Sequence, residues 1–285
     1  MGLLDYVKPV PTWSGRELKA FMADAEPGTY HLIDVRRPKE YERGHLPGAR
    51  LLHLGELADR SGELDRAKPV VTYCAAGVRS RAAAAVLIRA GFQNVHSLSG
   101  GVNAWGGHVA KGTPEAGMTI LPPSLEPEQA LAVLWTLEEG SRSFYAEMAD
   151  ALGGLHGTET FRELAESEEA HKDLLLDIYR DVMGRPADDD FPESALQERI
   201  DEPVMEGGLR VSKALEWTRY QSLQEALELS MAIEVNAYDL HLRMALAAKD
   251  EGARAAFRLL ATAEKDHLKR VTERLDEFIS SAAPL

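Results

Sequence analysis

Two different hydrophobic periodicities divide the chain. In the first third, short apolar runs alternate with stretches of helical period, and a capping box, Ser14-Gly15-Arg16-Glu17, precedes the first helical stretch. The pattern predicts strands at 31–35, 70–73 and 95–98, and helices at 15–24 and 79–90. Because strands and helices alternate, residues 1–110 are predicted to form an α/β domain around a mostly parallel sheet.

Beyond residue 126 the apolar positions follow a helical period to the end of the chain. The pattern predicts helices at about 127–152, 158–183, 219–249 and 251–280, with a long connection over 184–218. Two short-looped helix pairs joined by one long crossover are typical of a four-helix bundle, so an all-α domain is predicted over 127–285. Residues 111–126 are rich in Gly and Pro and are predicted to be a linker.

Length and charge support this division. A chain of 285 residues is long enough for two domains. Its net charge of −14 is uneven, because residues 1–110 hold 14 Lys and Arg against 11 Asp and Glu, whereas the remainder holds 18 against 35. A strongly acidic half argues against nucleic acid or an anionic membrane as a partner, since both require a basic face.

The chain has a single cysteine, Cys74. An intrachain disulfide, or a metal site built from several cysteines of one chain, is therefore impossible. The chain has no run of 18 apolar residues, so no membrane span is predicted. The N-terminus does not have the pattern of a secretory signal peptide. We expect a cytoplasmic, reducing location.

The acidic half contains an internal repeat. When the sequence is shifted by 96 residues, apolar positions such as Leu131 and Leu227 coincide, as in any duplicated helical hairpin. The polar matches are more informative because exposed polar positions are free to drift. They are Glu138 with Glu234, Glu168 with Glu264, and His171 with His267.

These six residues form a candidate metal site. Each half places one Glu 30 residues before a Glu-x-x-His motif, whose two members lie on one face of a helix. Apolar neighbours such as Leu164 and Leu260 indicate that this face points into the bundle. Buried carboxylates need compensating cations, which two metal ions would supply. The alternative is a solvated acidic face in which the histidines have no metal-binding role.

Residues from about 127 to 280 resemble the ferritin-like domain of the rubrerythrin family, in which a ligand Glu such as Glu138 precedes an aromatic pair such as Phe144-Tyr145. The resemblance implies two metal ions per chain, iron or alternatively manganese or zinc, and pairing of two chains through helix faces. Tyr145 would contact a ligand, and His241 would occupy the equivalent place in the second repeat. The implied ligands are Glu138, Glu168, His171, Glu234, Glu264 and His267, with Glu168 and Glu264 bridging.

Two departures from that family limit the functional prediction. Rubrerythrins proper carry a further Glu three positions after the second-half ligand, where this chain has Ala237. They also carry a four-cysteine iron site, which a single cysteine forbids. Peroxide reduction and Fe(II) oxidation remain alternatives for the helical domain, as does a non-enzymatic role in metal storage or sensing.

The segment Cys74-Ala75-Ala76-Gly77-Val78-Arg79-Ser80 follows a predicted strand and opens a predicted helix. Small residues allow its backbone N–H groups to converge on the sulfur, and the helix N-terminus and Arg79 add positive potential. Both effects lower the pKa of a thiol and would hold an anionic persulfide. The alternative is a buried, inert cysteine. Four residues separate Cys74 from Arg79, whereas cysteine-dependent phosphatases have five, so the loop suits a single sulfur atom.

Three motifs within residues 1–110 resemble those of rhodanese sulfurtransferases. They are Asp34-Val35-Arg36 with Glu40-Tyr41 and then Gly44-His45-Leu46-Pro47-Gly48-Ala49, the Cys74 loop, and Leu98-Ser99-Gly100-Gly101-Val102-Asn103-Ala104-Trp105. The resemblance implies that Cys74 carries sulfane sulfur from a small-molecule donor to a thiol or other thiophilic acceptor. Arg79 and Ser80 would support the persulfide, and the closing motif would serve packing. The implied cradle consists of the amides of Ala75, Ala76, Gly77, Val78 and Arg79.

Overall fold

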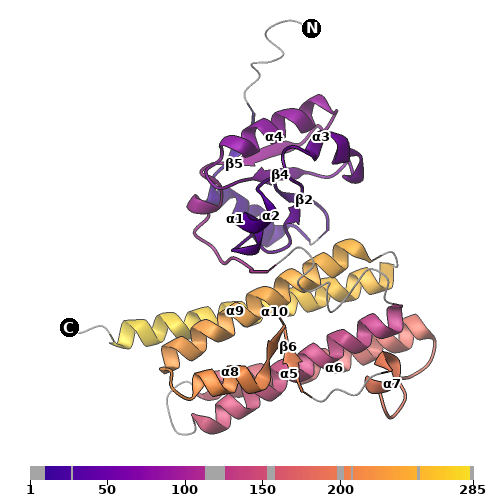
Figure 1. Cartoon of the computed structure of the whole chain (residues 1–285), viewed down its shortest axis with the longest axis vertical. Helices are drawn as coiled ribbons and strands as arrows, with labels where there is room; N and C mark the ends of the chain where they lie inside the picture. The colour runs from indigo at the N-terminus through magenta and orange to yellow at the C-terminus, as the bar shows by residue number, and fades with distance from the viewer. Residues whose placement is uncertain are drawn as a thin grey trace, which may run out of the picture. The chain divides into compact units, whose positions relative to one another are not determined.

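The computed structural model describes residues 10–26, 28–112, 126–152, 158–197, 202–206, 208–248 and 251–282 (Figure 1). Contacts divide the chain into two compact units, Met1–Pro114 and Glu115–Leu285. Most of the predicted linker, residues 113–125, lies outside the described residues. None of the helices in the described ranges is long and apolar enough to cross a membrane.

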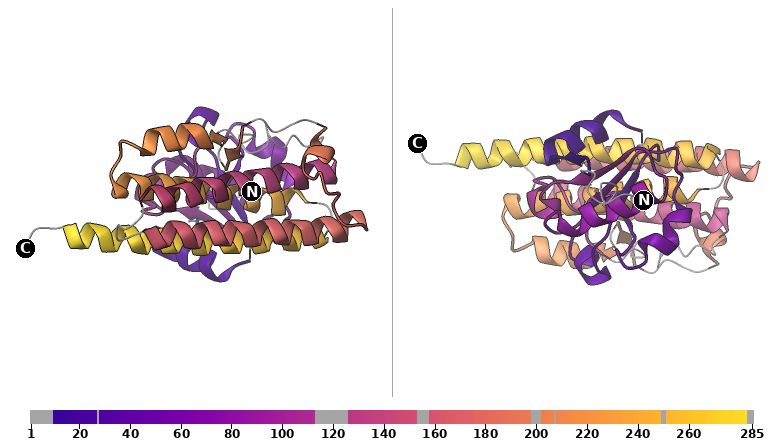
Figure 2. Two further views of the ribbon diagram at one scale, coloured as in Figure 1. Left: turned by 90° about the horizontal axis from the view of Figure 1, so that it is seen from below. Right: turned by 90° about the horizontal axis from the view of Figure 1, so that it is seen from above.

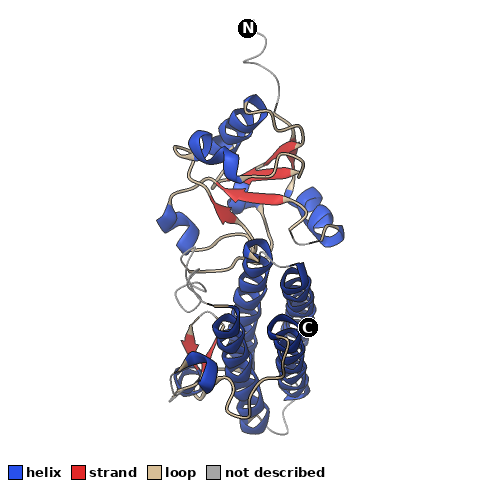
Figure 3. Cartoon of the chain, turned by 90° about the vertical axis from the view of Figure 1, so that its right-hand side faces the viewer, coloured by secondary structure: helices blue, strands red, loops and turns tan. Residues whose placement is uncertain are grey.

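The first unit is an α/β domain around a five-stranded sheet (Figure 3). Its strands are β1 (Thr12–Trp13), β2 (His31–Asp34), β3 (Arg50–Leu51), β4 (Val70–Tyr73) and β5 (Val95–Leu98). Its helices are α1 (Gly15–Asp24), α2 (Pro38–Glu42), α3 (Leu57–Arg60) and α4 (Val78–Arg89), with 3-10 turns η2 (Ser61–Glu63) and η3 (Gly101–Ala104). The strand order is β1-β5-β4-β2-β3 and every pair is parallel, which confirms the predicted α/β class.

Each face of this sheet is covered by a hydrophobic cluster, because side chains along the buried strands point alternately to the two faces. Ile33 and Val70 belong to a cluster that includes residues of α3 and α4, whereas their neighbours Leu32 and Val71 belong to a second cluster that includes residues of α1 and α2. Consecutive side chains point to opposite faces of a strand, so a sheet covered on both sides needs an unbroken apolar run.

The second unit contains four long helices, α5 (Pro127–Ala151), α6 (Thr158–Met183), α9 (Leu223–Ala247) and α10 (Glu251–Ala282). Helix α5 packs along α6, and α9 along α10 (Figure 2). Short connections join each pair, so the members of a pair run antiparallel. The predicted all-α four-helix domain is thereby confirmed.

The long crossover between the two pairs has structure of its own. It holds α7 (Glu193–Leu196), a hairpin of β6 (Val204–Met205) with β7 (Leu209–Arg210), and α8 (Val211–Thr218). The prediction that a helix begins at residue 219 was wrong, because α9 begins at Leu223. Ser222 ends the preceding turn and forms a reciprocal capping box with Glu225, which satisfies the first free N–H groups of α9.

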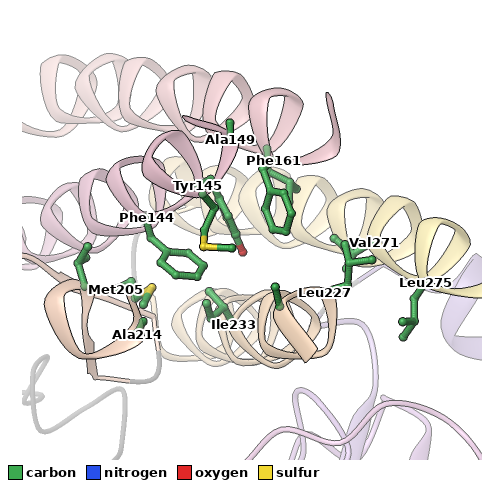
Figure 4. Close-up of a cluster of buried hydrophobic side chains, with 14 residues drawn as sticks. Phe144, Tyr145, Ala149, Phe161, Met205, Ala214, Leu227, Ile233, Val271 and Leu275 are labelled. Atoms are coloured by element: carbon green, nitrogen blue, oxygen red, sulfur yellow. The ribbon is translucent and has the colours of Figure 1, made fainter. Parts of the chain in front are cut away.

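Two apolar clusters fill the bundle, one toward each end. The first includes Phe144 and Phe161 and is drawn in Figure 4, and the second includes Leu134 and Phe257. Along each long helix, the predicted metal-binding residues lie between members of the two clusters. The bundle therefore carries one buried polar layer between two apolar ones.

Candidate functional site

The Cys74 loop joins the end of β4 to the start of α4. Cys74 is buried, and its sulfur accepts a hydrogen bond of 3.1 Å from the backbone N–H of Gly77. Gly77 has φ +89°, a left-handed conformation that glycine adopts without strain, and it turns the chain directly into the helix. The small residues of this loop thus bring backbone N–H groups to the sulfur, as the sequence predicts.

The closing motif, residues 98–105, contacts the backbone of the Cys74 loop. A Cβ on Gly101 would lie 2.1 Å from the carbonyl oxygen of Cys74, so only glycine permits this approach. The N–H groups of Val102 and Asn103 donate to the carbonyls of Cys74 and Ala75, at 2.8 and 3.1 Å. The contribution of this motif is therefore to fix the backbone that carries the cysteine.

Hydrogen bonds to the sulfur favour the thiolate. Burial opposes ionisation of Cys74, but donors from Ser80, Ala76 and Gly77 outweigh it and hold the thiol pKa below its ordinary value. The Ser80 hydroxyl is itself fixed, because it bonds to the carbonyl of Gly77 at 3.1 Å and to the Ser97 hydroxyl at 2.8 Å.

Arg79 is bound to a carboxylate from another element. Its guanidinium donates two hydrogen bonds, of 2.8 and 2.7 Å, to Glu40 on α2. The bonds from Arg79 lower the pKa of Glu40 to about 2, so the carboxylate stays ionised at neutral pH. They also raise the pKa of Arg79, to which Cys74 contributes a smaller electrostatic effect. Val78 is exposed, so it can serve the loop only through its backbone.

The first motif fixes α2 and, with it, Glu40. The buried Asp34 carboxylate accepts hydrogen bonds from the backbone and guanidinium of Arg36. Nη2 of Arg36 also donates to the carbonyl of Gly44 at 2.6 Å. His45 stacks on Tyr41 with ring centroids 3.7 Å apart. Asp34, Arg36 and His45 are therefore structural residues of the segment that positions Glu40, a residue to which the sequence assigned no role.

In the helical unit, the structure brings together all six residues of the predicted metal site. Glu138 comes from α5, Glu234 from α9, and the two Glu-x-x-His pairs from α6 and α10. All six are buried, with 6% exposure at most. The motif repeated in the sequence thus forms one cluster on four helices.

The two central carboxylates each face both histidines. Glu168 presents Oε2 to Nδ1 of His171 at 2.9 Å and Oε1 to Nδ1 of His267 at 3.6 Å. Glu264 presents Oε1 to His171 at 3.1 Å and Oε2 to His267 at 3.4 Å. One oxygen of each carboxylate therefore belongs to each histidine, which is the arrangement that a carboxylate bridging two ions requires.

Each histidine also faces one terminal carboxylate. Oε2 of Glu138 lies 3.2 Å from Nδ1 of His171, and Oε2 of Glu234 lies 3.1 Å from Nδ1 of His267. The two imidazoles stack with centroids 4.9 Å apart. The cluster thus consists of two equivalent half-sites, each with a terminal Glu, a His and one oxygen from each central Glu.

Unsatisfied polar atoms show that this cluster fits metal ions. Among the described residues, Oε1 of Glu138, Oε2 of Glu168 and both oxygens of Glu264 accept no hydrogen bond of good geometry, although histidine nitrogens lie close to them. Burial and the neighbouring Glu264 raise the pKa of Glu168, while carboxylates raise that of His171 against the effect of its burial. Converging buried oxygens with mixed protonation are what divalent or trivalent cations neutralise.

Three further polar residues border the cluster. The Tyr145 hydroxyl donates to Glu234, and His241 lies with Nε2 3.2 Å from Oε1 of Glu138. Glu206, which directly follows β6, is buried and accepts a hydrogen bond from Ser141. Burial, followed by the charges of Glu138 and Glu264, raises the pKa of Glu206.

The sequence analysis found Tyr145 through the family resemblance and His241 through the repeat, but it missed Glu206. Glu206 belongs to the crossover, which has no counterpart elsewhere in the chain. It reaches the cluster because the hairpin packs on α5 at Gly140, where a Cβ would lie 2.3 Å from the carbonyl oxygen of Val204.

Comparison with known families decides the identity of both units. Residues 15–108 match the rhodanese-like domain, and residues 130–275, just over half of the chain, match the rubrerythrin family. The chain belongs to the rubrerythrin family and carries a rhodanese-like domain before it. Its helical unit is accordingly a rubrerythrin domain with a buried Glu/His cluster.

Individual relatives match the rhodanese-like domain. An uncharacterized protein YqhL of Bacillus subtilis is 45% identical over 78 residues, which cover 27% of this chain and 62% of that protein. The thiosulfate sulfurtransferase GlpE of Pseudoalteromonas translucida is 35% identical over 26% of this chain and 70% of its own length. A rhodanese-related protein from Thermoplasma volcanium is 27% identical, covers 35% of this chain and 97% of its own, and has a TM-score of 0.32.

Proposed function

We propose that the rhodanese-like domain is a sulfurtransferase that carries a persulfide on Cys74. The observation that carries this proposal is the buried sulfur that accepts the Gly77 N–H, with a thiol pKa below its ordinary value. Similarity to GlpE proteins over this domain supports thiosulfate as a donor. Physiological donors and acceptors are small molecules or thiols able to reach the loop.

Sulfur transfer by Cys74 requires only a sulfur donor and a thiophilic acceptor. The Cys74 thiolate attacks the outer sulfur of thiosulfate, the S–S bond of thiosulfate breaks, and sulfite leaves with the electron pair of that bond. A thiophile such as cyanide then attacks the outer sulfur of the persulfide, forms thiocyanate and releases the thiolate. The N–H groups of the loop stabilise the anionic sulfur in both states.

Replacement of Cys74 tests this assignment. We expect Cys74→Ser to abolish formation of thiocyanate, because a serine hydroxyl does not ionise at neutral pH and does not carry sulfane sulfur. Intact-protein mass spectrometry after thiosulfate treatment should show one added sulfur atom in the wild type and none in the variant. Thiocyanate production by Cys74→Ser at the wild-type rate would refute the assignment.

For the rubrerythrin domain we propose a di-metal centre that binds two ions, with iron as the first choice and manganese or zinc as alternatives. Glu138 and Glu234 would be terminal ligands, Glu168 and Glu264 bridging ligands, and His171 and His267 would each complete one half-site. Bound iron would supply one-electron redox chemistry. The chain's own residues hold the site rigidly between two apolar clusters that exclude water, and Tyr145 orients Glu234 through its hydroxyl.

Metal analysis tests the second proposal. Full-length protein reconstituted with Fe(II) without oxygen should hold about two ions per chain. Less than half an ion per chain, with no difference between the wild type and Glu168→Ala, would refute the di-metal centre. If about two ions bind, peroxide reduction and Fe(II) oxidation are the oxidoreductase activities to assay in the metal-loaded protein.

A further inference from the structure

His241 is a fully buried polar side chain beside the cluster, and it is not one of the six predicted ligands. Its exposure is 0%, and within the described part of the chain neither of its ring nitrogens makes a hydrogen bond of good geometry. Burying an imidazole without a hydrogen bond costs free energy, so a ring nitrogen of His241 is expected to bind some other group.

The geometry around His241 indicates where that group lies. Nε2 of His241 lies 3.2 Å from Oε1 of Glu138 and 3.8 Å from Oε1 of Glu264. These carboxylate oxygens likewise accept no hydrogen bond of good geometry among the described residues. Three mutually close ligand atoms thus face one another without hydrogen bonds, and the three residues form a group able to hold a cation.

Such spacing is that of ligands to a shared ion. Two ligand atoms that each lie about 2.1 Å from one ion, at roughly a right angle, are about 3 Å apart. The internal repeat supplies a contrast. Tyr145 occupies the place equivalent to His241, but its hydroxyl donates a hydrogen bond to Glu234, the terminal carboxylate of the other half-site. The phenol is thus engaged as a donor, whereas His241 offers a free nitrogen.

We propose that His241 is a seventh ligand of the metal centre and binds, through Nε2, the ion held by Glu138 and His171. This inference rests on the proposed di-metal centre. The half-site of Glu138 then has five protein ligands and that of Glu234 has four. The two ions are therefore inequivalent, and the first to bind occupies the half-site with His241.

Cobalt(II) provides a direct count of the bound imidazoles. Full-length protein loaded with Co(II) alone should show, in proton NMR, one strongly shifted and solvent-exchangeable N–H resonance for each coordinated histidine. We expect three in the wild type and two in His241→Gln. The matched control is Tyr145→Phe at the equivalent repeat position, which should keep three. His241→Tyr introduces the residue found at the equivalent repeat position and should also show two resonances. If one of the two His241 variants fails to fold, the other still tests the inference.

The outcomes separate this inference from the proposal beneath it. Two resonances in the wild type, unchanged in a folded His241 variant, would overturn the seventh ligand and leave the six-ligand centre intact. No shifted resonance at all would overturn the di-metal centre and this inference with it. A Co(II) titration gives a second readout, in which the tighter of two sites should weaken at least about tenfold in His241→Gln.

Discussion

Gly140→Ala tests how the crossover hairpin is held against α5. The added Cβ would lie 2.3 Å from the carbonyl oxygen and 2.6 Å from the carbonyl carbon of Val204. Non-bonded atoms settle at about 3.5 Å, so the contact must open by about 1 Å. Both opposing atoms belong to the backbone, which means that no side chain can turn aside and the hairpin itself must move.

Two effects of opposite sign determine how much Gly140→Ala changes the free energy of unfolding. Alanine in a helix is favoured over glycine by up to about 1 kcal/mol. Overpacking a well-filled site costs about 1–3 kcal/mol, and loosening the hydrogen bond between Ser141 and Glu206 costs about 1 kcal/mol more. Movement of the hairpin also disturbs Met205, whose side chain is fully buried in the bundle. We therefore expect a net destabilisation of about 2 kcal/mol, which lowers Tm by roughly 4–8 °C in a unit of this size.

Thermal unfolding of the metal-free protein, followed by circular dichroism, measures this change without a contribution from bound ions. Gly62→Ala is the matched control, because a Cβ at Gly62 would meet no atom within 4 Å and its backbone is not left-handed. A Tm of Gly140→Ala equal to or above that of the wild type would show that helix propensity prevails. The close packing of the hairpin on α5 would then be refuted.

Three further predictions concern the two sites. Arg79→Ala should raise the thiol pKa of Cys74 and slow sulfur transfer at little cost in stability, seen as an alkylation profile displaced to higher pH, while the adjacent exposed Arg81→Ala leaves the profile unchanged. Glu168→Ala should weaken metal binding more than Glu138→Ala in a Co(II) titration, since Glu168 faces both histidines; equal losses would contradict bridging. Metal-free protein should lose stability as pH rises from about 5 through 7, because burial raises the pKa of Glu234 to about 7. A folded pKa above the unfolded one gives stability that is lost as pH rises, and metal, which binds the ionised form, should reverse the slope of Tm against pH.

The long helices, the main strands and the six cluster residues could be predicted because their patterns are local or repeated. Apolar periodicity defined the four long helices and the main strands, and the capping box at Ser14 marks the start of α1. The Glu-x-x-His motif is short enough to stay on one helix face, and its second copy at a constant spacing separates it from chance. Neither inference required knowledge of which helices touch.

The residues to which the sequence analysis assigned no role contact groups that are far away in the sequence. Glu40 precedes Arg79 by 39 positions, and nothing local to α2 indicates that its carboxylate faces the Cys74 loop. Glu206 lies in a crossover rich in acidic residues, where no periodicity separates it from partly exposed neighbours such as Glu202. The boundary between α8 and α9 was missed for a different reason, since helical period continues across a turn that only the cap at Ser222 reveals.

Several departures from repeat symmetry fall on the half-site of Glu138. The crossover occurs once in the bundle, so the hydroxyl of Ser141 and the carboxylate of Glu206 have no equivalents near Glu234; the position 96 residues after Ser141 is Ala237. Burial, followed by the charges of Glu138 and Glu264, raises the pKa of Glu206, so this half-site has a further buried carboxyl group that resists ionisation. Duplication of a helical hairpin by itself would give two identical ion sites. The crossover and divergent repeat positions, such as Ser141 against Ala237 and Tyr145 against His241, make the surroundings of the two half-sites different.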